Sequence, residues 1–225
     1  MAEPTPIRDT AENVKVIYQM SAKTNFKEAV GQFYDKWAEH YDEDLENSKY
    51  VAPVGGAEEL SKRVEDKNAL IIDCAAGTGQ VGVELAKRGF KNIDAVDLSQ
   101  KSLDISASKG VYRKLFCDSL GKNKIKGVED GCYDALTCIG AIGVGHIAED
   151  AFVEWNRIVK KGGIMVFSAS KISFENEPER QKEIKNQIRA AIKDLVEQGQ
   201  WEMLEHKDMD YLFGHQADMF TVRRL

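Results

Sequence analysis

The chain has 225 residues, of which 43% are hydrophobic and 30% charged, a balance typical of a globular protein with a substantial core. Its formal net charge of −6 argues against a broad basic surface for nucleic acid. The first residues, Met1-Ala-Glu-Pro-Thr-Pro, lack the basic and apolar run of a signal peptide, and no apolar stretch is long enough to span a bilayer. We therefore expect a cytoplasmic protein without a nucleic-acid or membrane partner.

The four cysteines favour the same compartment. Cys74, Cys117, Cys132 and Cys138 include no pair with C-x-x-C spacing, and three of them lie in apolar or strand-like segments. We expect free thiols, without disulfides or a bound metal, in a reducing environment.

Helical spacing characterises residues 11–66, which follow a loose tail at residues 1–10. Apolar side chains recur there at steps of three and four, which places them on one helical face. They are Phe26, Val30, Phe33, Tyr34, Trp37 and Tyr41. The acidic stretch 42–47 is expected to end this helix, and Pro53 suits the first turn of the next one.

From residue 69 onward, short apolar runs alternate with helical segments. Continuous apolar runs are typical of strands that are buried on both faces of a parallel sheet. The run at residues 69–72 is expected to be such a strand, and further strands are expected at residues 93–96, 111–116, 133–139 and 164–167. Helices are expected between them and after the last, at residues 79–88, 99–110, 149–159 and 178–198.

Local signals mark several ends of these elements. Gly89 suits the residue after a helix, Ser99 can cap the next helix, and Gly162-Gly163 is expected to turn the chain into the fifth strand. Strands at 201–213 and 217–224 are joined by a turn at Gly214, too short for a crossover helix, so they must be antiparallel.

These elements predict one α/β domain over residues 1–225. The core, residues 67–225, is expected to be a Rossmann-like, doubly wound sheet of seven strands with an antiparallel C-terminal hairpin. Residues 11–66 are expected to form an N-terminal helical lid.

A glycine-rich loop, D-C-A-A-G-T-G at residues 73–79, follows the first strand and opens a helix. Its glycines allow a sharp turn and a close approach to a ligand. The helix N-terminus offers N–H donors and a partial positive charge to a carboxylate or phosphate. Asp73 could receive a cation, so the loop suits a zwitterionic amino-acid group.

Two more acids follow the second and third strands. Asp97 can hold both hydroxyls of a ribose, and Asp118 could accept a hydrogen bond from an adenine amine. Since ligands bind at the carboxyl edge of open α/β sheets, we expect an amino-acid end, a ribose and a base to bind there side by side.

These residues resemble those of the class I S-adenosylmethionine (SAM)-dependent methyltransferases. Within that class, the chain is most similar to the Williams–Beuren syndrome region methyltransferase-like proteins, from Asn25 to Leu225. The resemblance is carried by Y-D-K-W-A-E-H-Y-D at 34–42, the 73–79 loop, Asp97, Cys117-Asp118 and Tyr133-Asp134. One departure is Cys74-Ala-Ala, where many relatives have a glycine.

The resemblance implies SAM as the cofactor and assigns roles to residues. The glycine loop with Asp73 would face the methionine part, Asp97 would hold the ribose, and Asp118-Ser119 would flank the adenine. Lid residues Tyr34, Trp37 and Tyr41 would be mobile and close over the cofactor. The candidate cofactor-binding residues are Tyr34, Trp37, Tyr41, Asp73, Cys74, Ala75, Gly77, Thr78, Gly79, Asp97, Leu98, Ser99, Asp118, Ser119, Cys138 and Ile139.

His146 is the candidate catalytic residue. It follows the fourth strand, where a methyl acceptor should approach, and could take a proton from the nucleophile; it could equally cap the next helix. The sequence favours a small-molecule acceptor but does not identify it. A protein methyltransferase or a non-catalytic SAM-binding module remains open.

The pattern G-x-G-x-x-G at residues 77–82 would also suit an NAD(P)-dependent oxidoreductase. In dinucleotide folds the first glycine usually follows the strand directly, whereas Asp73-Cys-Ala-Ala intervenes here. This spacing and the antiparallel C-terminal hairpin favour SAM.

Overall fold

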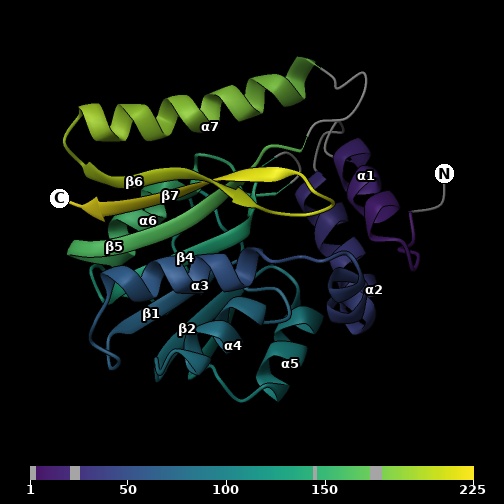
Figure 1. Cartoon of the computed structure of the whole chain (residues 1–225), viewed down its shortest axis with the longest axis horizontal. Coiled ribbons are helices and arrows are strands. Elements are labelled where there is room, and N and C mark those ends of the chain that lie inside the picture. Colours follow the sequence, from purple (N-terminus) through teal and green to yellow (C-terminus); the bar gives the residue numbers. More distant parts are fainter. Residues whose placement is uncertain (1–3, 21–25, 144–145, 173–178) are drawn as a thin grey trace.

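The computed structural model describes residues 4–20, 26–143, 146–172 and 179–225, and it contains one mixed seven-stranded sheet with helices on both faces (Figure 1). In chain order the elements are α1 (Thr10–Met20), α2 (Phe26–Asn47), α3 (Ala52–Arg63), β1 (Leu70–Cys74), α4 (Gln80–Lys87), β2 (Asn92–Asp97), α5 (Gln100–Ser108), β3 (Lys114–Cys117), β4 (Tyr133–Ile142), α6 (Ala151–Ile158), β5 (Val159–Ser170), α7 (Glu179–Glu197), β6 (Trp201–Asp210) and β7 (Gln216–Arg224). The predicted Rossmann-like fold class is confirmed.

The strand order is β3-β2-β1-β4-β5-β7-β6. The first five strands pair in parallel, whereas β7 runs antiparallel to both β5 and β6, as the short Gly214 connection requires. The order reverses beside β1, which pairs with β2 on one side and β4 on the other. Such a switch point leaves a crevice at the carboxyl ends of the strands, where ligands bind in open α/β sheets.

Helices cover both faces of the sheet (Figure 1). On one face, α3 and α4 bury Leu60 and Leu85 against Ile71 of β1. On the other face, Trp155 of α6 and Ile192 of α7 pack into the cluster that contains much of β4 and β5. No described helix combines the length and the apolar character that crossing a membrane requires.

Helices α1 and α2 lie beyond the carboxyl edge of the parallel strands, whereas α3 lies along the sheet (Figure 1). The Tyr18 hydroxyl of α1 donates to the carbonyl of Ile172, just past β5, at 3.2 Å. The crevice at the switch point is therefore covered by the N-terminal part of the chain.

The structure corrects the predicted end of α2. The acidic stretch continues the helix to Asn47 because its central acid, Asp44, is buried and paired. The Asp44 carboxylate accepts from Trp37 Nε1 at 2.9 Å and from Arg8 Nε at 2.7 Å. An acid that would weaken an isolated helix is thus held in the folded protein by two donors.

The starts of two strands also differ from the prediction by three or more residues. β3 begins at Lys114 rather than at residue 111, and β5 begins at Val159 rather than after Gly162-Gly163. The register between β4 and β5 shifts after Tyr133↔Val159, so the two glycines lie in an irregular part of the strand and not in a turn before it. The side chain of Phe26 and Pro178 lie outside the described residues.

Two buried tryptophans allow a matched test of the core. Trp155 and Trp201 both pack against Phe152 and Phe167. Trp201 Nε1 donates to Asn156 Oδ1 at 2.5 Å, whereas Trp155 Nε1 is buried without a partner in the described part of the chain. The two side chains therefore share apolar surroundings and differ in hydrogen bonding.

We expect Trp201→Phe to lower the free energy of unfolding by about 1 kcal/mol more than Trp155→Phe, because only the first loses a hydrogen bond. Truncation of either residue to Ala should cost about 3–5 kcal/mol. Urea unfolding of the four variants measures these differences, and a larger loss in Trp155→Phe than in Trp201→Phe would contradict the assignment.

Candidate active site

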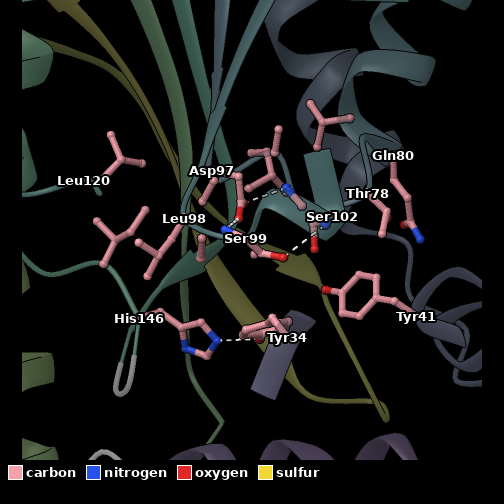
Figure 2. Close-up of a pocket in the computed structure, with 18 of the residues that line it drawn as sticks. Tyr34, Tyr41, Thr78, Gln80, Asp97, Leu98, Ser99, Ser102, Leu120 and His146 are labelled. Carbon is pink, nitrogen blue, oxygen red and sulfur yellow. Dashed lines mark hydrogen bonds between the residues drawn. The ribbon is translucent and has the colours of Figure 1, made fainter. Parts of the chain in front are cut away.

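A cavity opens at the carboxyl edge of the sheet, between the ends of β1, β2 and β4 and the covering helix α2 (Figure 2). We call it the first cavity. It brings together most of the residues singled out in the sequence: Tyr34, Tyr41, Ala75, Gly77, Thr78, Asp97, Leu98, Ser99, Asp118, Ser119, Ile139 and His146. Segments more than 100 residues apart therefore meet around one space.

Asp97 organises the floor of the first cavity (Figure 2). Its Oδ2 accepts from the Gly77 N–H and its Oδ1 from the Ser99 N–H, each at 2.8 Å. Burial raises the pKa of Asp97, although these backbone donors oppose the shift. Each carboxylate oxygen has a second lone pair, so Asp97 can still accept from two ligand hydroxyls.

The 73–79 loop leaves room for a ligand. Gly77 has φ +53°, and a Cβ added there would meet no atom within 4 Å, so this side of the loop is open. Ala75 has φ +52°, a conformation that costs an L-residue roughly 1–2 kcal/mol relative to glycine. A glycine at position 75 would adopt this conformation without the strain.

Asp73 lies behind the first cavity and does not line it. Its side chain is only 1% exposed, and it accepts from the Tyr112 hydroxyl at 2.7 Å and from the Thr137 hydroxyl at 2.9 Å. Burial raises its pKa to about 7, and the two hydroxyl donors only partly offset that effect. The carboxyl group thus ties β1 to β4 and to Tyr112 beneath the loop.

Four other candidate residues also do not line the first cavity. Cys74 and Cys138 are fully buried in the sheet, and Gly79 is in close contact with Tyr112 and Ser106. Trp37 is 2% exposed and packs beside Tyr34 and Tyr41. All four cysteines are free thiols.

At the far end of the first cavity, Asp118 holds its own loop together. Its Oδ1 accepts from the Ser119 N–H at 2.8 Å, and its Oδ2 accepts from the Lys126 N–H at 3.2 Å. Apolar side chains, Leu98 and Leu120, line the cavity nearby (Figure 2). This end can therefore receive a flat, partly apolar group edged by polar atoms.

Helix α2 is attached to the loops of the site by two acids that the sequence analysis missed. The Asp42 carboxylate accepts from the Thr78 hydroxyl at 2.5 Å and the Gln80 amide at 2.9 Å, and it pairs with Lys109 at 2.5 Å. Burial opposes ionisation of Asp42, but Lys109 and the neutral donors outweigh it and lower the pKa.

The second acid is Asp35, which follows Tyr34 directly in α2 and lies two residues before Trp37. It accepts from the Ser99 hydroxyl at 2.5 Å, and Ser99 in turn accepts from the Ser102 N–H as the cap of α5. Asp35 and Asp42 are seven residues apart and so share a helical face. Their seven-residue spacing was the available signal in the sequence, but the neighbouring aromatic face was interpreted as the functional one.

A second cavity adjoins the first one on the side of α1 and the connection between β6 and β7. Both cavities are lined by Tyr34, Tyr41, Tyr50, Gly140 and His146, so they share a wall. Tyr34 Oη and His146 Nε2 are 2.6 Å apart on this wall (Figure 2). Tyr50 is a further site residue that sequence reasoning missed, since it lies between two helices with no motif around it.

The described residues include no group of three or more His, Cys, Asp or Glu side chains placed to hold a metal ion. The arrangement instead offers carboxylates, backbone N–H groups and aromatic rings. Such a set can orient an organic ligand with a polar end, a hydroxylated middle and a flat apolar end.

Comparisons with known proteins agree with this geometry. A family profile described as a methyltransferase domain matches residues 72–167. Methyltransferase-like protein 27 of Homo sapiens is 31% identical over 183 residues, which cover 80% of this chain and 71% of that protein.

Solved structures share the fold at low sequence identity. The magnesium protoporphyrin IX methyltransferase from Synechocystis PCC 6803 with bound SAH superposes with a TM-score of 0.58 at 13% identity, covering 77% of this chain and 81% of that one. The [4+2]-cyclase SpnF superposes with a TM-score of 0.58 at 13% identity, covering 76% and 81%. Likeness at this level concerns the fold alone.

Asp73 should link stability to pH. Its pKa of about 7 in the folded protein lies well above the value of about 3.9 in an unfolded chain. Its stabilising contribution is therefore full below about pH 4 and is lost as the pH rises to about 7. In Asp73→Asn we expect the free energy of unfolding to decline less over this range than in the wild type.

Urea unfolding at a series of pH values measures the two slopes. Asp104→Asn, at an exposed position of α5, is the control and should keep the slope of the wild type. Equal slopes in the wild type and Asp73→Asn would show that Asp73 titrates as an ordinary aspartate.

Asp42→Ala should loosen α2. The variant loses one ion pair and two hydrogen bonds to the loops of the site, all at a partly exposed position, so the cost to global stability should stay near 1 kcal/mol. We expect limited proteolysis within α1 and α2 to be several-fold faster, because local opening becomes easier. Glu46→Ala, on an exposed face of the same helix, should be cleaved at the wild-type rate; equal rates for both variants would contradict the attachment.

Proposed function

The chain belongs to the class I SAM-dependent methyltransferases, whose cofactor is SAM, and from that premise we propose that it transfers the methyl group to a small molecule that binds beneath α2. The observation that carries the proposal is the Asp97 carboxylate, held by two backbone N–H groups at the switch point of the sheet. Ligand hydroxyls can reach it from the first cavity.

The residues present fit this cofactor. The open side of Gly77 and the N-terminal turn of α4 would receive the amino-acid end, and Asp97 would hold the ribose hydroxyls. Leu98, Leu120 and Asp118 would surround the adenine. Asp73, with its carboxyl group behind the loop, would position the loop rather than touch the ligand.

SAM supplies a methyl group that is already electrophilic because it is bonded to a sulfonium. The protein then contributes alignment and the exclusion of water. Tyr34 and Tyr41 from α2 face the core across the first cavity, so the docked helix fixes the walls between which the acceptor and cofactor must meet (Figure 2). Orientation of this kind can lower a barrier by roughly 7–11 kcal/mol in favourable cases.

The position of α2 favours a small acceptor over a protein. The helix lies across the carboxyl edge and is attached through Asp35 and Asp42, so α2 covers one side of the space in which an acceptor would bind. Magnesium protoporphyrin IX, named for one structural neighbour, is also a small molecule. The neighbour named as a cyclase is a reminder that this fold alone does not fix the reaction.

The third glycine of G-x-G-x-x-G has a structural role that does not involve a dinucleotide. Gly82 donates its N–H to the Tyr112 hydroxyl at 3.1 Å, and a Cβ there would lie 2.3 Å from that hydroxyl. The glycine therefore admits Tyr112, which in turn holds Asp73. This packing accounts for Gly82 without a bound dinucleotide, so the motif alone does not favour an oxidoreductase.

The proposal predicts the binding behaviour of Asp97 variants. Calorimetric titration of the wild type should detect SAM and its demethylated product, with no response to NAD. Asp97→Ala should weaken SAM binding at least 100-fold, since two hydrogen bonds to a charged group are worth about 3 kcal/mol or more. Asp104→Ala, an exposed acid on the neighbouring helix, should bind like the wild type.

Two outcomes would count against the proposal. Binding of NAD but not SAM would favour an NAD(P)-dependent oxidoreductase instead. Binding of SAM without transfer of a labelled methyl group to any small-molecule extract, together with transfer to a protein extract, would replace the small acceptor by a protein.

A further inference from the structure

The second cavity is rich in tyrosine. Its described lining includes Tyr18, Tyr34, Tyr41, Tyr50 and Tyr211, besides Trp37, His146, Ser170, aliphatic side chains and backbone. No Asp, Glu, Lys or Arg occurs among these described lining residues. Burial raises the pKa of Tyr34, Tyr41, Tyr50 and Tyr211, so these rings are neutral at physiological pH.

A neutral lining selects against charged ligands. Moving an unpaired carboxylate or ammonium group from water into such a space costs several kcal/mol, whereas a neutral hydroxyl requires only a hydrogen-bond partner. The tyrosine rings supply large apolar surfaces, and their hydroxyls supply the partners. The chemistry of the second cavity therefore suits an uncharged molecule with an apolar body and few polar groups.

One polar contact on the shared wall is suited to proton transfer. Tyr34 Oη lies 2.6 Å from His146 Nε2, and both residues line the two cavities. Histidine is the usual general base in enzymes. Tyr34 and His146 lie on the wall between the two cavities. A group bound in the second cavity would therefore face a methyl group in the first across this pair.

We propose that the methyl acceptor is an uncharged small molecule with a weakly acidic hydroxyl, bound in the second cavity, and that Tyr34 and His146 together remove the hydroxyl proton. This inference rests on the proposed function and names the substrate class and the base of that same site.

The proposed transfer is a displacement at the methyl carbon. The acceptor oxygen forms a bond to the methyl carbon, the carbon–sulfur bond breaks, and its electron pair remains on sulfur. The acceptor proton passes to Tyr34 Oη while the proton of Tyr34 passes to His146 Nε2. The products are a methyl ether, a neutral thioether and an imidazolium.

Other nucleophiles fit this site less well. An aliphatic amine enters at neutral pH as a cation, and a carboxylic acid enters as an anion that needs no base. A thiol is a weak hydrogen-bond donor to a tyrosine oxygen. A phenol or enol is neutral, donates a strong hydrogen bond and gains nucleophilicity when its proton is removed.

The pair also couples catalysis to the docking of α2. Tyr34 belongs to α2, whereas His146 follows β4, so their contact exists only with the helix in place. Asp35, next to Tyr34 in the chain, holds that part of α2 against Ser99. Helix docking thus completes the proton path at the moment it closes the cavities.

The test uses the full chain, methyl-labelled SAM and three matched probes. These are 4-methylphenol, its anionic relative 4-hydroxybenzoate and its cationic relative 4-(aminomethyl)phenol. We expect label in the methyl ether of 4-methylphenol, with kcat/KM at least 10-fold above that of either charged relative. Equal or faster transfer to a charged relative, or no transfer to 4-methylphenol by protein that binds SAM, would overturn the proposal.

Variants test the proton path separately. Tyr34→Phe, which keeps the ring, and His146→Gln should each lower kcat for 4-methylphenol about 100-fold or more, while the Kd for SAM stays within about three-fold of the wild type. His215→Gln, at an exposed turn, is the control and should keep the wild-type kcat. Retained kcat in both site variants would overturn the base assignment.

SAM titration distinguishes the proposed function from the inference about the acceptor and the base. Failure of the wild type to bind SAM would overturn the proposed function and this inference with it. Normal SAM binding with any of the overturning results above would leave the proposed function standing and remove only the acceptor class or the base.

Discussion

Two backbone N–H groups from separate loops converge on the Asp97 carboxylate, and much of the site follows from that convergence. One N–H, from Gly77, fixes the loop after β1, and the other, from Ser99, fixes the start of α5. Hydrogen bonds to a charged group contribute about 1.5–3 kcal/mol each, so the carboxylate holds both loops firmly at the switch point. Ser99 connects these loops to α2, because its hydroxyl donates to Asp35 of that helix. A single strand-end acid thus connects the floor of the site to the helix that covers it.

Two adjacent faces of helix α2 contribute to the site, and their residues are shifted by one position in the sequence. Tyr34 and Tyr41 are seven residues apart and line the first cavity, and Asp35 and Asp42 repeat that spacing beside them and bind the loops. Any rotation that withdraws the acids therefore also withdraws the tyrosines. The polar contacts are partly exposed, and contacts of that kind are individually weak. We expect such an attachment to be released when ligands enter or leave, because the contacts that hold it are few and partly exposed.

Several signals that act within a few residues were interpreted correctly from the sequence: the buried first strand, the Ser99 cap and the antiparallel hairpin. The predictions were wrong where contacts with residues distant in the sequence determine the local structure. Asp44 continues α2 because Arg8 and Trp37 meet it, and neither contact is visible in the acidic stretch itself. Asp73 was placed at the right strand end, but a side chain at a strand end can face the ligand or the sheet. Its direction depends on Tyr112, 39 residues further along the chain. Sequence reasoning located the edge of the sheet and could not assign which of its acids point outward.

The division of charge between the two cavities bears on the chemistry. Acids occupy the first cavity, where Asp97 and Asp118 face a space suited to a cationic cofactor, and the described lining of the second cavity carries none. In the proposed transfer a sulfonium becomes a neutral thioether while a neutral imidazole becomes an imidazolium, so the total charge within the enclosed space is unchanged. A low-dielectric site penalises new or separated charge far more than the relocation of an existing one. A hydroxyl acceptor with a histidine base therefore suits the site beneath α2, since no ion has to enter the tyrosine-lined cavity and the imidazolium forms as the sulfonium charge is lost.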